Sequence, residues 1–454
     1  MDNQQLLRGN LKKNLIRLSL PTSVSFALQS FYDMVDMMWI GRISSFAIAG
    51  VTIFSTVFWM VLVLNEIIGT SSVSLITQSY GKNDIERTRR VLEQTLTFKM
   101  LVAIISAIII ALILEPLLWF FSKDEKVIQS ALEYGYIRIF FLPIMFASYS
   151  VNTALRCLGD AKTPMKIMVI SSVVNIILDP IFMFEKVPFV DIPGLNMGVF
   201  GAALATVIST IVAFLLGFYV LVNGQSPIKI SLKGLLKLDW GIDKKLLTIG
   251  LPTGVEVLMR NLSSMITLKF VSVYGTDAVA AMGIGSKLIH LAFTPISGVS
   301  ISSSAMVGQA LGSEQVDVAE KTANISAKLN IIVLSIFSAI AILVPQWFMK
   351  LFTDEKLVIE TGIPMIRVLI PSTILTGWSL GLGSVFFGSG HNTPYLLSSI
   401  ISRWVVQIPL LYITTSILHL PILYAWFSFM IAEACELLTI YYHYKKGIWK
   451  INRI

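Results

Sequence analysis

The sequence predicts an all-α membrane protein of twelve transmembrane helices, arranged as two six-helix lobes related by an internal repeat. Three observations lead to this prediction: the composition, the number of long apolar runs, and the similarity of the two halves. Hydrophobic residues make up 55% of the 454 residues and charged residues only 14%, whereas soluble domains carry about 25% charged residues. The chain therefore has too little charge to cover a surface that faces water.

The apolar runs are long and numerous enough for twelve membrane crossings. A hydrocarbon core about 30 Å thick needs about 20 mostly apolar residues in each helix. Charged and turn residues separate twelve such runs, which cover residues 14–40, 46–78, 92–121, 128–157, 163–184, 195–222, 245–274, 277–309, 321–351, 357–388, 394–418 and 421–444. Residues 1–222 then form an N-lobe, 223–244 a polar and basic connector, and 245–454 a C-lobe.

Basic residues are distributed unequally between the two sides of the predicted membrane. If the N-terminus is cytoplasmic, the inner segments carry most of the Lys and Arg, and the outer segments carry only Arg42, Lys123, Lys126, Lys186, Lys350 and Lys356. Cytoplasmic loops of membrane proteins carry such an excess. We therefore expect a multi-pass protein of the plasma membrane (the cell inner membrane), with both termini and the connector in the cytoplasm. The net charge of +8 then reflects orientation in the lipid bilayer and indicates no nucleic-acid partner.

The second half of the chain repeats the first at a nearly constant separation. RLSLPTSVSFAL at 17–28 matches TIGLPTGVEVLM at 248–259, which places Pro21 over Pro252. The later matches are Gln78-x-x-Gly81 over Gln309-x-x-Gly312, Asp124-Glu125-Lys126 over Asp354-Glu355-Lys356, and Thr163-Pro164 over Thr393-Pro394. Because six is an even number, both halves cross the membrane in the same sense. They should be related by an axis along the membrane normal, with the substrate site near their interface.

Polar and acidic residues interrupt two predicted helices of the first half. Gln29, Asp33 and Asp36 lie in one, and Asn175 and Asp179 in the other, at spacings that place each group on or near one helix face. An ionised side chain at mid-bilayer costs about 2.5–3.5 kcal/mol on insertion scales, so it usually faces a cavity or a partner. Asp36 and Asp179 both lie shortly before the outer ends of their helices. The carboxylates and amide oxygens make a cluster suited to a proton or Na⁺, or a structural polar network.

The second half does not copy these acidic residues. Thr267 occupies the repeat position of Asp36, and Glu256 is followed four residues later by Arg260, a spacing that permits an intrahelical ion pair. Later helices of this half hold the further polar residues Arg403, Gln407, Glu433 and Glu436. Mutual neutralisation inside the helix bundle and a role in ion or substrate handling both remain open for these groups.

Several segments resemble the multidrug and toxin extrusion (MATE) exporters of the MOP flippase superfamily. In the first half they are LPTSVSFALQSFYDMVDMMWIG, QSYGKNDIERTRRV, NTALRCLGDAKTPM, VVNIILDPIFMF and GVFGAALATVIS, and in the second GLPTGVEVLMRNLSSM, GQALGSEQ and FFGSGHNTP. The resemblance spans essentially the whole chain. The paired aspartates make the sequence most similar to the DinF-like branch.

The resemblance implies two six-helix lobes around a central cleft, and secondary active export of small organic cations or drugs. Export would proceed by antiport with Na⁺ or H⁺ through alternating access, in a monomer without a cofactor. The branch's cation-coupling site, where Na⁺ would bind, maps onto Asp36, Asn175, Asp179 and Thr206. The substrate cavity is predicted to include Gln29, Asp33, Asn152 and Glu256. Of these, Glu256 matches a carboxylate that other branches use for coupling.

Several alternatives compete with this interpretation, and one of them, a non-transporting receptor, leaves the repeat and the buried carboxylates unexplained. A lipid-linked oligosaccharide flippase of the same superfamily tends to line its cavity with several basic residues for pyrophosphate, whereas the first lobe offers carboxylates. A membrane-embedded enzyme is not expected, because the four His residues are scattered without metal-ligand spacing. The chain also lacks a Walker loop, which argues against an ATP-driven pump.

Overall fold

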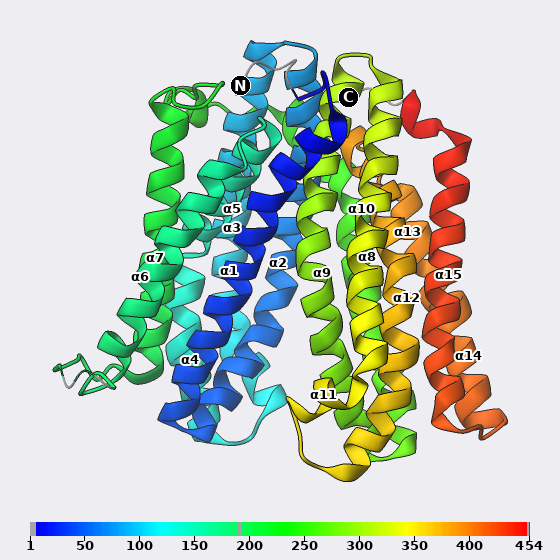
Figure 1. Cartoon of the computed structure of the whole chain (residues 1–454). Coiled ribbons are helices and arrows are strands. Elements are labelled where there is room, and N and C mark those ends of the chain that lie inside the picture. The colour runs from blue at the N-terminus through cyan, green and yellow to red at the C-terminus, as the bar shows by residue number, and fades with distance from the viewer. Residues whose placement is uncertain (1–5, 189, 191, 452–453) are drawn as a thin grey trace. The chain divides into compact units, whose positions relative to one another are not determined.

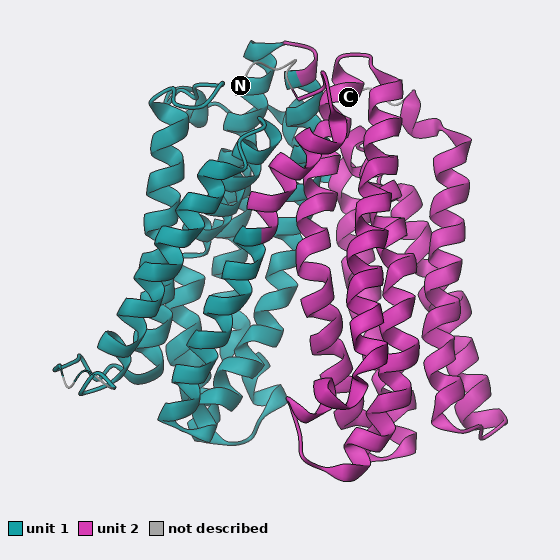
Figure 2. Ribbon diagram, in the orientation of Figure 1, with its two compact units in different colours: residues 1, 24–80, 84–248 teal, residues 2–23, 81–83, 249–454 magenta. Residues whose placement is uncertain are grey.

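The computed structural model describes residues 6–188, 190, 192–451 and 454, and these residues form a helical protein (Figure 1). The contacts between residues divide the chain into two compact units (Figure 2). Unit 1 contains Val24–Tyr80 and Asp84–Thr248, and unit 2 contains the residues up to Ser23, Gly81–Asn83 and Ile249–Ile454. The first part of the first helix is thus grouped with the second half of the chain.

Unit 1 holds most of the helices of the first half. They are α1 (Leu11–Ile43, from Val24 onward), α2 (Ser45–Gly81), α3 (Ile85–Phe121), α4 (Glu125–Phe140), α5 (Leu142–Cys157), α6 (Lys162–Met183) and α7 (Gly198–Val222). A single 3₁₀ turn, η1 (Gly234–Leu236), follows α7.

Unit 2 holds the helices of the second half. They are α8 (Trp240–Val271, from Ile249 onward), η2 (Ser272–Tyr274), α9 (Thr276–Gly312), α10 (Val316–Leu343), α11 (Pro345–Lys350), α12 (Lys356–Ser389), α13 (Thr393–Ser399), η3 (Ile400–Gln407), α14 (Ile408–Tyr412), η4 (Ile413–Ile417), α15 (Ile422–Lys446) and η5 (Ile448–Lys450). Leu7 lies in the same hydrophobic cluster as Tyr444 and Trp449, so both ends of the described chain meet at one end of this unit (Figure 1).

Helical segments occupy all twelve regions that the sequence predicts as spans. Among the described residues, nine helices are long and apolar enough to cross a membrane, and the bent pair α4–α5 makes a tenth. The other two regions are α1 and α8. They contain several of the acidic and basic residues singled out from the sequence, including Asp36 in α1 and Glu256 in α8.

Two apolar runs that the sequence suggests as single helices are interrupted, each beside a proline. Region 128–157 bends by 57° between α4 and α5, and Pro143 lies in the first turn of α5. Region 321–351 breaks between α10 and α11, which begins at Pro345. Proline lacks an N–H and clashes with the preceding turn, so these two corrections share one physical cause. Region 394–418 forms one membrane-spanning helix, Thr393–Ile417, which contains two π-helical segments on either side of α14, whose first turn holds Pro409.

The connector between the two halves is hydrogen-bonded to side chains of α3. The buried Glu93 accepts a hydrogen bond from the Ser231 amide at 2.7 Å, and the Thr97 hydroxyl donates to the Leu235 carbonyl at 2.7 Å. Gln94 accepts from the Asp239 amide at 3.0 Å and donates to the Lys237 carbonyl. The connector is therefore held by side chains of unit 1. Its only helical segment within the described residues before α8 is the short turn η1.

Candidate functional site

Two acidic side chains are buried inside unit 1. Asp36 on α1 is 6% exposed and Asp179 on α6 is 0% exposed. At 1.5 Å per residue, they lie about 10 Å and about 6 Å from the C-terminal ends of their helices. The structure therefore places both carboxyls near helix ends, as the sequence predicts, but away from water.

Glycines allow the helices around these carboxyls to pack closely. A Cβ atom at Gly135 on α4 would lie 2.6 Å from the Phe54 ring on α2. A Cβ atom at Gly201 on α7 would lie 2.7 Å from the Phe182 carbonyl on α6. Any larger residue at these positions would push the helices apart. The two glycines thus help to hold α4 and α7 near the acidic residues.

Asp36 is connected to α4 through a chain of hydrogen bonds. The Tyr134 hydroxyl donates to Asp36 Oδ2 at 3.4 Å. Arg138 Nη1 in turn donates to the Tyr134 hydroxyl oxygen at 2.7 Å. The second carboxylate oxygen, Asp36 Oδ1, is buried and has no hydrogen-bond partner among the described residues.

Asp179 is bonded to its neighbour one helical turn earlier. Asn175 Nδ2 donates to Asp179 Oδ1 at 3.2 Å, as expected for residues four apart on one helix face. Asn175 Oδ1 and Asp179 Oδ2 are both buried without a hydrogen-bond partner in the described chain. Asp36 also interacts electrostatically with Asp179. The structure thus brings Asp36, Asn175 and Asp179 into one neighbourhood.

The three unpartnered atoms are all acceptors. Asp36 Oδ1, Asn175 Oδ1 and Asp179 Oδ2 offer lone pairs but no proton when the carboxyls are ionised. A buried acceptor without a donor is costly, and a proton or a hard cation bound by oxygen would satisfy it. In the described part of the chain, no group of three or more His, Cys, Asp or Glu could hold a metal ion.

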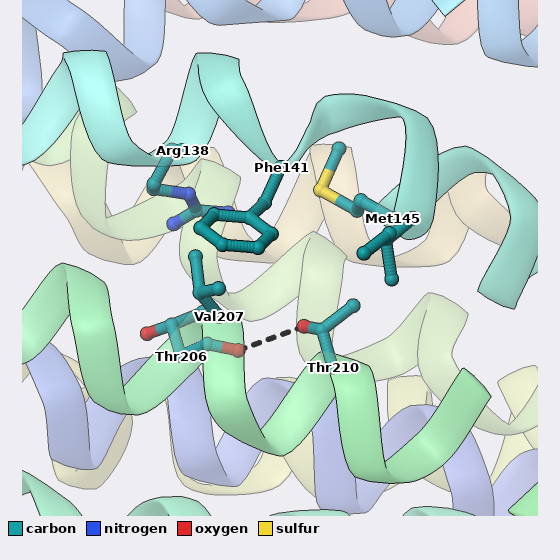
Figure 3. Close-up of a pocket in the computed structure, with 7 residues that line it drawn as sticks. Arg138, Phe141, Met145, Thr206, Val207 and Thr210 are labelled. Carbon is teal, nitrogen blue, oxygen red and sulfur yellow. Dashed lines mark hydrogen bonds between the residues drawn. The ribbon is translucent and has the colours of Figure 1, made fainter. Parts of the chain in front are cut away.

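Among the described residues, no hydrogen bond joins the other predicted residues of the first lobe to this cluster. Thr206 lines a pocket with Arg138 (Figure 3), and its hydroxyl donates to the Ala202 carbonyl at 3.0 Å. Gln29 donates to Asp33 at 3.2 Å, and Asp33 is exposed. Asn152 lies on α5, and its side-chain oxygen is buried without a hydrogen-bond partner in the described chain.

Sequence reasoning missed two basic residues inside unit 1. The Arg138 guanidinium lies over the rings of Phe58 and Tyr134, at 5.3 Å and 5.4 Å from their centroids. Lys99 on α3 is only 1% exposed and interacts electrostatically with Glu66. Both lie within predicted spans, where a charged residue is itself a signal of function. The sequence alone could therefore have identified Lys99 and Arg138 as candidate functional residues.

Unit 2 gathers its polar residues into one ionic network. Arg260 pairs with Glu256 at 2.6 Å and with Glu436 at 3.5 Å, and Arg403 pairs with Glu433 at 2.5 Å and with Glu436 at 3.8 Å. Hydroxyl and amide groups complete it: Thr376 donates to Glu433, Ser402 donates to Glu436 and Arg403 donates to Gln407. Glu256 is therefore neutralised by an arginine, unlike the carboxyl pair of unit 1.

The repeated helical fold and its buried polar groups define a multi-pass membrane transporter. The MatE family model matches residues 21–181 and again residues 252–413. The two matches begin at Pro21 and Pro252, the pair that the internal repeat aligns, so the predicted repeat is confirmed. The chain belongs to the MATE family of multidrug efflux transporters.

Relatives resemble the chain over nearly its whole length. It is 28% identical to the probable multidrug resistance protein YoeA of Bacillus subtilis (strain 168), over 99% of this chain and 97% of that protein. It is 25% identical to the probable multidrug resistance protein NorM of Thermotoga maritima, over 93% of this chain and 89% of that protein. A solved structure of MATE in the bent conformation matches with a TM-score of 0.90 at 24% identity, over 99% of this chain and 98% of the other. That similarity shows the fold.

Proposed function

We propose that this protein exports small organic cations and drugs by secondary active antiport with Na⁺ or H⁺, through alternating access. It would act as a monomer in the plasma membrane, without a cofactor and with both termini in the cytoplasm. The observation that carries the proposal is the set of three buried, unpartnered oxygens on Asp36, Asn175 and Asp179. The multidrug names of the relatives support the substrate class.

The electrostatics of unit 1 suggest how ion entry drives export. Two carboxylates that share a poorly hydrated site cannot both stay ionised cheaply, so they attract either the coupling ion or a cationic substrate. A bound proton or Na⁺ removes the charge that held the substrate. The substrate then loses its electrostatic partner and leaves, while the neutralised helices can pack together. Asp36 and Asp179 would bind the ion, and Thr206 would lie at the edge of the same site.

We expect purified protein in lipid vesicles to export a cationic dye when only an Na⁺ or proton gradient is imposed. The ion gradient supplies the free energy, so adding nucleotide should change nothing. Dye flux measured with each gradient separately also identifies the coupling ion. Export that requires ATP hydrolysis and ignores both gradients would refute the proposal.

We expect residues 82–90, which form the loop after α2 and the first turn and a half of α3, to face the cytoplasm. Arg87, Arg89 and Arg90 make this segment strongly basic, and basic segments that flank membrane spans remain inside. The first and last described parts of the chain, which meet at one end of unit 2, should be on the same side. Single cysteines placed in the loop and near each terminus should react with an impermeant reagent only after the cells are opened. Labelling of residues 82–90 in intact cells would contradict the predicted orientation and indicate the opposite one.

A flippase for lipid-linked oligosaccharides is a second candidate, favoured by the basic residues of unit 1. Lys99 and Arg138 are both cations inside this unit, in addition to the carboxylates that the sequence predicts there. A pyrophosphate would need such groups. Each of them, however, already has an acidic or hydroxyl partner, Glu66 for Lys99 and Tyr134 for Arg138. Translocation of a lipid-linked pyrophosphate in the same vesicles, with no dye export, would favour this candidate.

A further inference from the structure

The buried carboxyl pair has a permanent positive charge beside it. Arg138 interacts electrostatically with Asp36 and reaches it through the Tyr134 hydroxyl. An arginine side chain stays protonated in proteins. Asp36, Asp179 and Arg138 together therefore carry one net negative charge when both carboxyls are ionised.

Arg138 is held in place by contacts other than a direct ion pair. Its guanidinium stacks over Phe58 and Tyr134 and donates to the Tyr134 hydroxyl at 2.7 Å. Among the described residues, no ion pair within 4 Å joins it to Asp36. Figure 3 shows Arg138 and Phe141 facing α7, which carries Thr206. The positive charge is thus fixed next to the site and leaves Asp36 Oδ1 available.

The surrounding titratable groups include one further carboxyl, Asp33, which is exposed and lies outside the buried pair. Those that interact with Arg138 or with the two carboxyls are Tyr32, Asp33, Tyr134 and Tyr149. The tyrosines are neutral near pH 7, and Asp33 is exposed and bonded to Gln29. Glu66 and Lys99 interact electrostatically and carry opposite charges.

We propose that Arg138 is a fixed counter-charge that sets the coupling stoichiometry at one monovalent cation per transport cycle. An unbalanced charge inside a poorly hydrated site is expensive, so the site binds enough cation to reach neutrality. With Arg138 present, one proton or one Na⁺ is enough. Without it, the two carboxyls need two. This inference rests on the proposed ion-coupled function.

The test compares wild type, Arg138→Gln and Arg138→Lys in vesicles with the membrane voltage clamped at zero. The ion that drives wild type is set at known ratios across the membrane, and the dye ratio at which net flux stops is measured. For wild type and Arg138→Lys, a tenfold ion ratio should balance a dye ratio of about tenfold, because equal free energies then oppose each other. For Arg138→Gln, the same ion ratio should balance a dye ratio of about a hundredfold.

A direct count of bound cations keeps the test decisive if Arg138→Gln does not transport. Purified protein is titrated with acid or equilibrated with radioactive Na⁺, and the ions bound in the site are counted against a double mutant of Asp36 and Asp179. One cation for wild type and two for Arg138→Gln supports the inference. If wild type and Arg138→Gln bind the same number of cations and balance the same dye ratio, the inference is overturned. If wild-type dye distribution ignores every ion ratio, the proposed function itself fails, which is a separate result.

Discussion

Asp36→Asn is expected to reduce ion-driven export to the level of protein-free vesicles, while the protein still folds and inserts. Asparagine has the shape of aspartate and can still accept from Tyr134, so the hydrogen bond at 3.4 Å need not be lost. The change removes the negative charge that attracts the coupling ion and the substrate. The expected loss is therefore one of coupling and not of structure. Export rate as a function of pH and Na⁺ concentration, on protein that elutes as a single folded species, measures it.

Three further variants sharpen this first prediction. Asp179→Asn should behave nearly like Asp36→Asn, because its carboxyl offers the other buried oxygen. Thr206→Ala should weaken dependence on Na⁺ more than dependence on protons, since a proton needs no additional oxygen ligand. Glu256→Gln is the matched control, and it should be milder because Arg260 already neutralises Glu256 at 2.6 Å. Coupling like that of wild type in Asp36→Asn, together with an inactive Glu256→Gln, would move the site to unit 2.

Arg403→Ala is expected to cause the largest loss of stability. Arg403 and Glu433 are almost fully buried, with side chains 12% and 11% exposed, and Arg403 also lies 3.8 Å from Glu436. Removing one partner of a buried ion pair costs about 3–5 kcal/mol, because an uncompensated charge remains behind. The midpoint of thermal unfolding in detergent should fall by many degrees, whatever the effect on transport.

A surface ion pair provides the control for this second prediction. Lys356 and Glu360 lie 3.8 Å apart, with side chains 87% and 57% exposed. Exposed pairs contribute little, so Lys356→Ala should leave the unfolding midpoint nearly unchanged. An Arg403→Ala variant as stable as Lys356→Ala would show that the network of unit 2 does not hold its helices together.

Much of the fold could be predicted because its signals are local or periodic. The apolar runs located all twelve helical regions, and Pro21 and Pro252 located the repeat. Helix ends were less predictable, because hydropathy falls where charged residues begin although the helix continues. Thus α3 begins at Ile85, before its apolar run. The bend at Phe141 could have been predicted from Pro143, which lies in the following turn.

The candidate site was partly predictable for the same reason. Asn175 and Asp179 lie on one helix, and their spacing of four residues predicts the hydrogen bond of 3.2 Å between them. The approach of Asp36 to Tyr134 depends on the packing of α1 against α4, which no local pattern encodes. Arg138 carried a usable signal as a charge within a span. In unit 2, spacing indicated the pair Glu256–Arg260, but only the packing of α8, η3 and α15 joins it to Arg403.

The most direct test of the central claim measures cation binding to the purified transporter. Proton uptake on acidification, and its competition by Na⁺, should be lost in Asp36→Asn and in Asp179→Asn and retained in Glu256→Gln. That pattern would place the coupling ion on the unpartnered oxygens of unit 1. Binding retained in both aspartate variants and lost in Glu256→Gln would contradict the account.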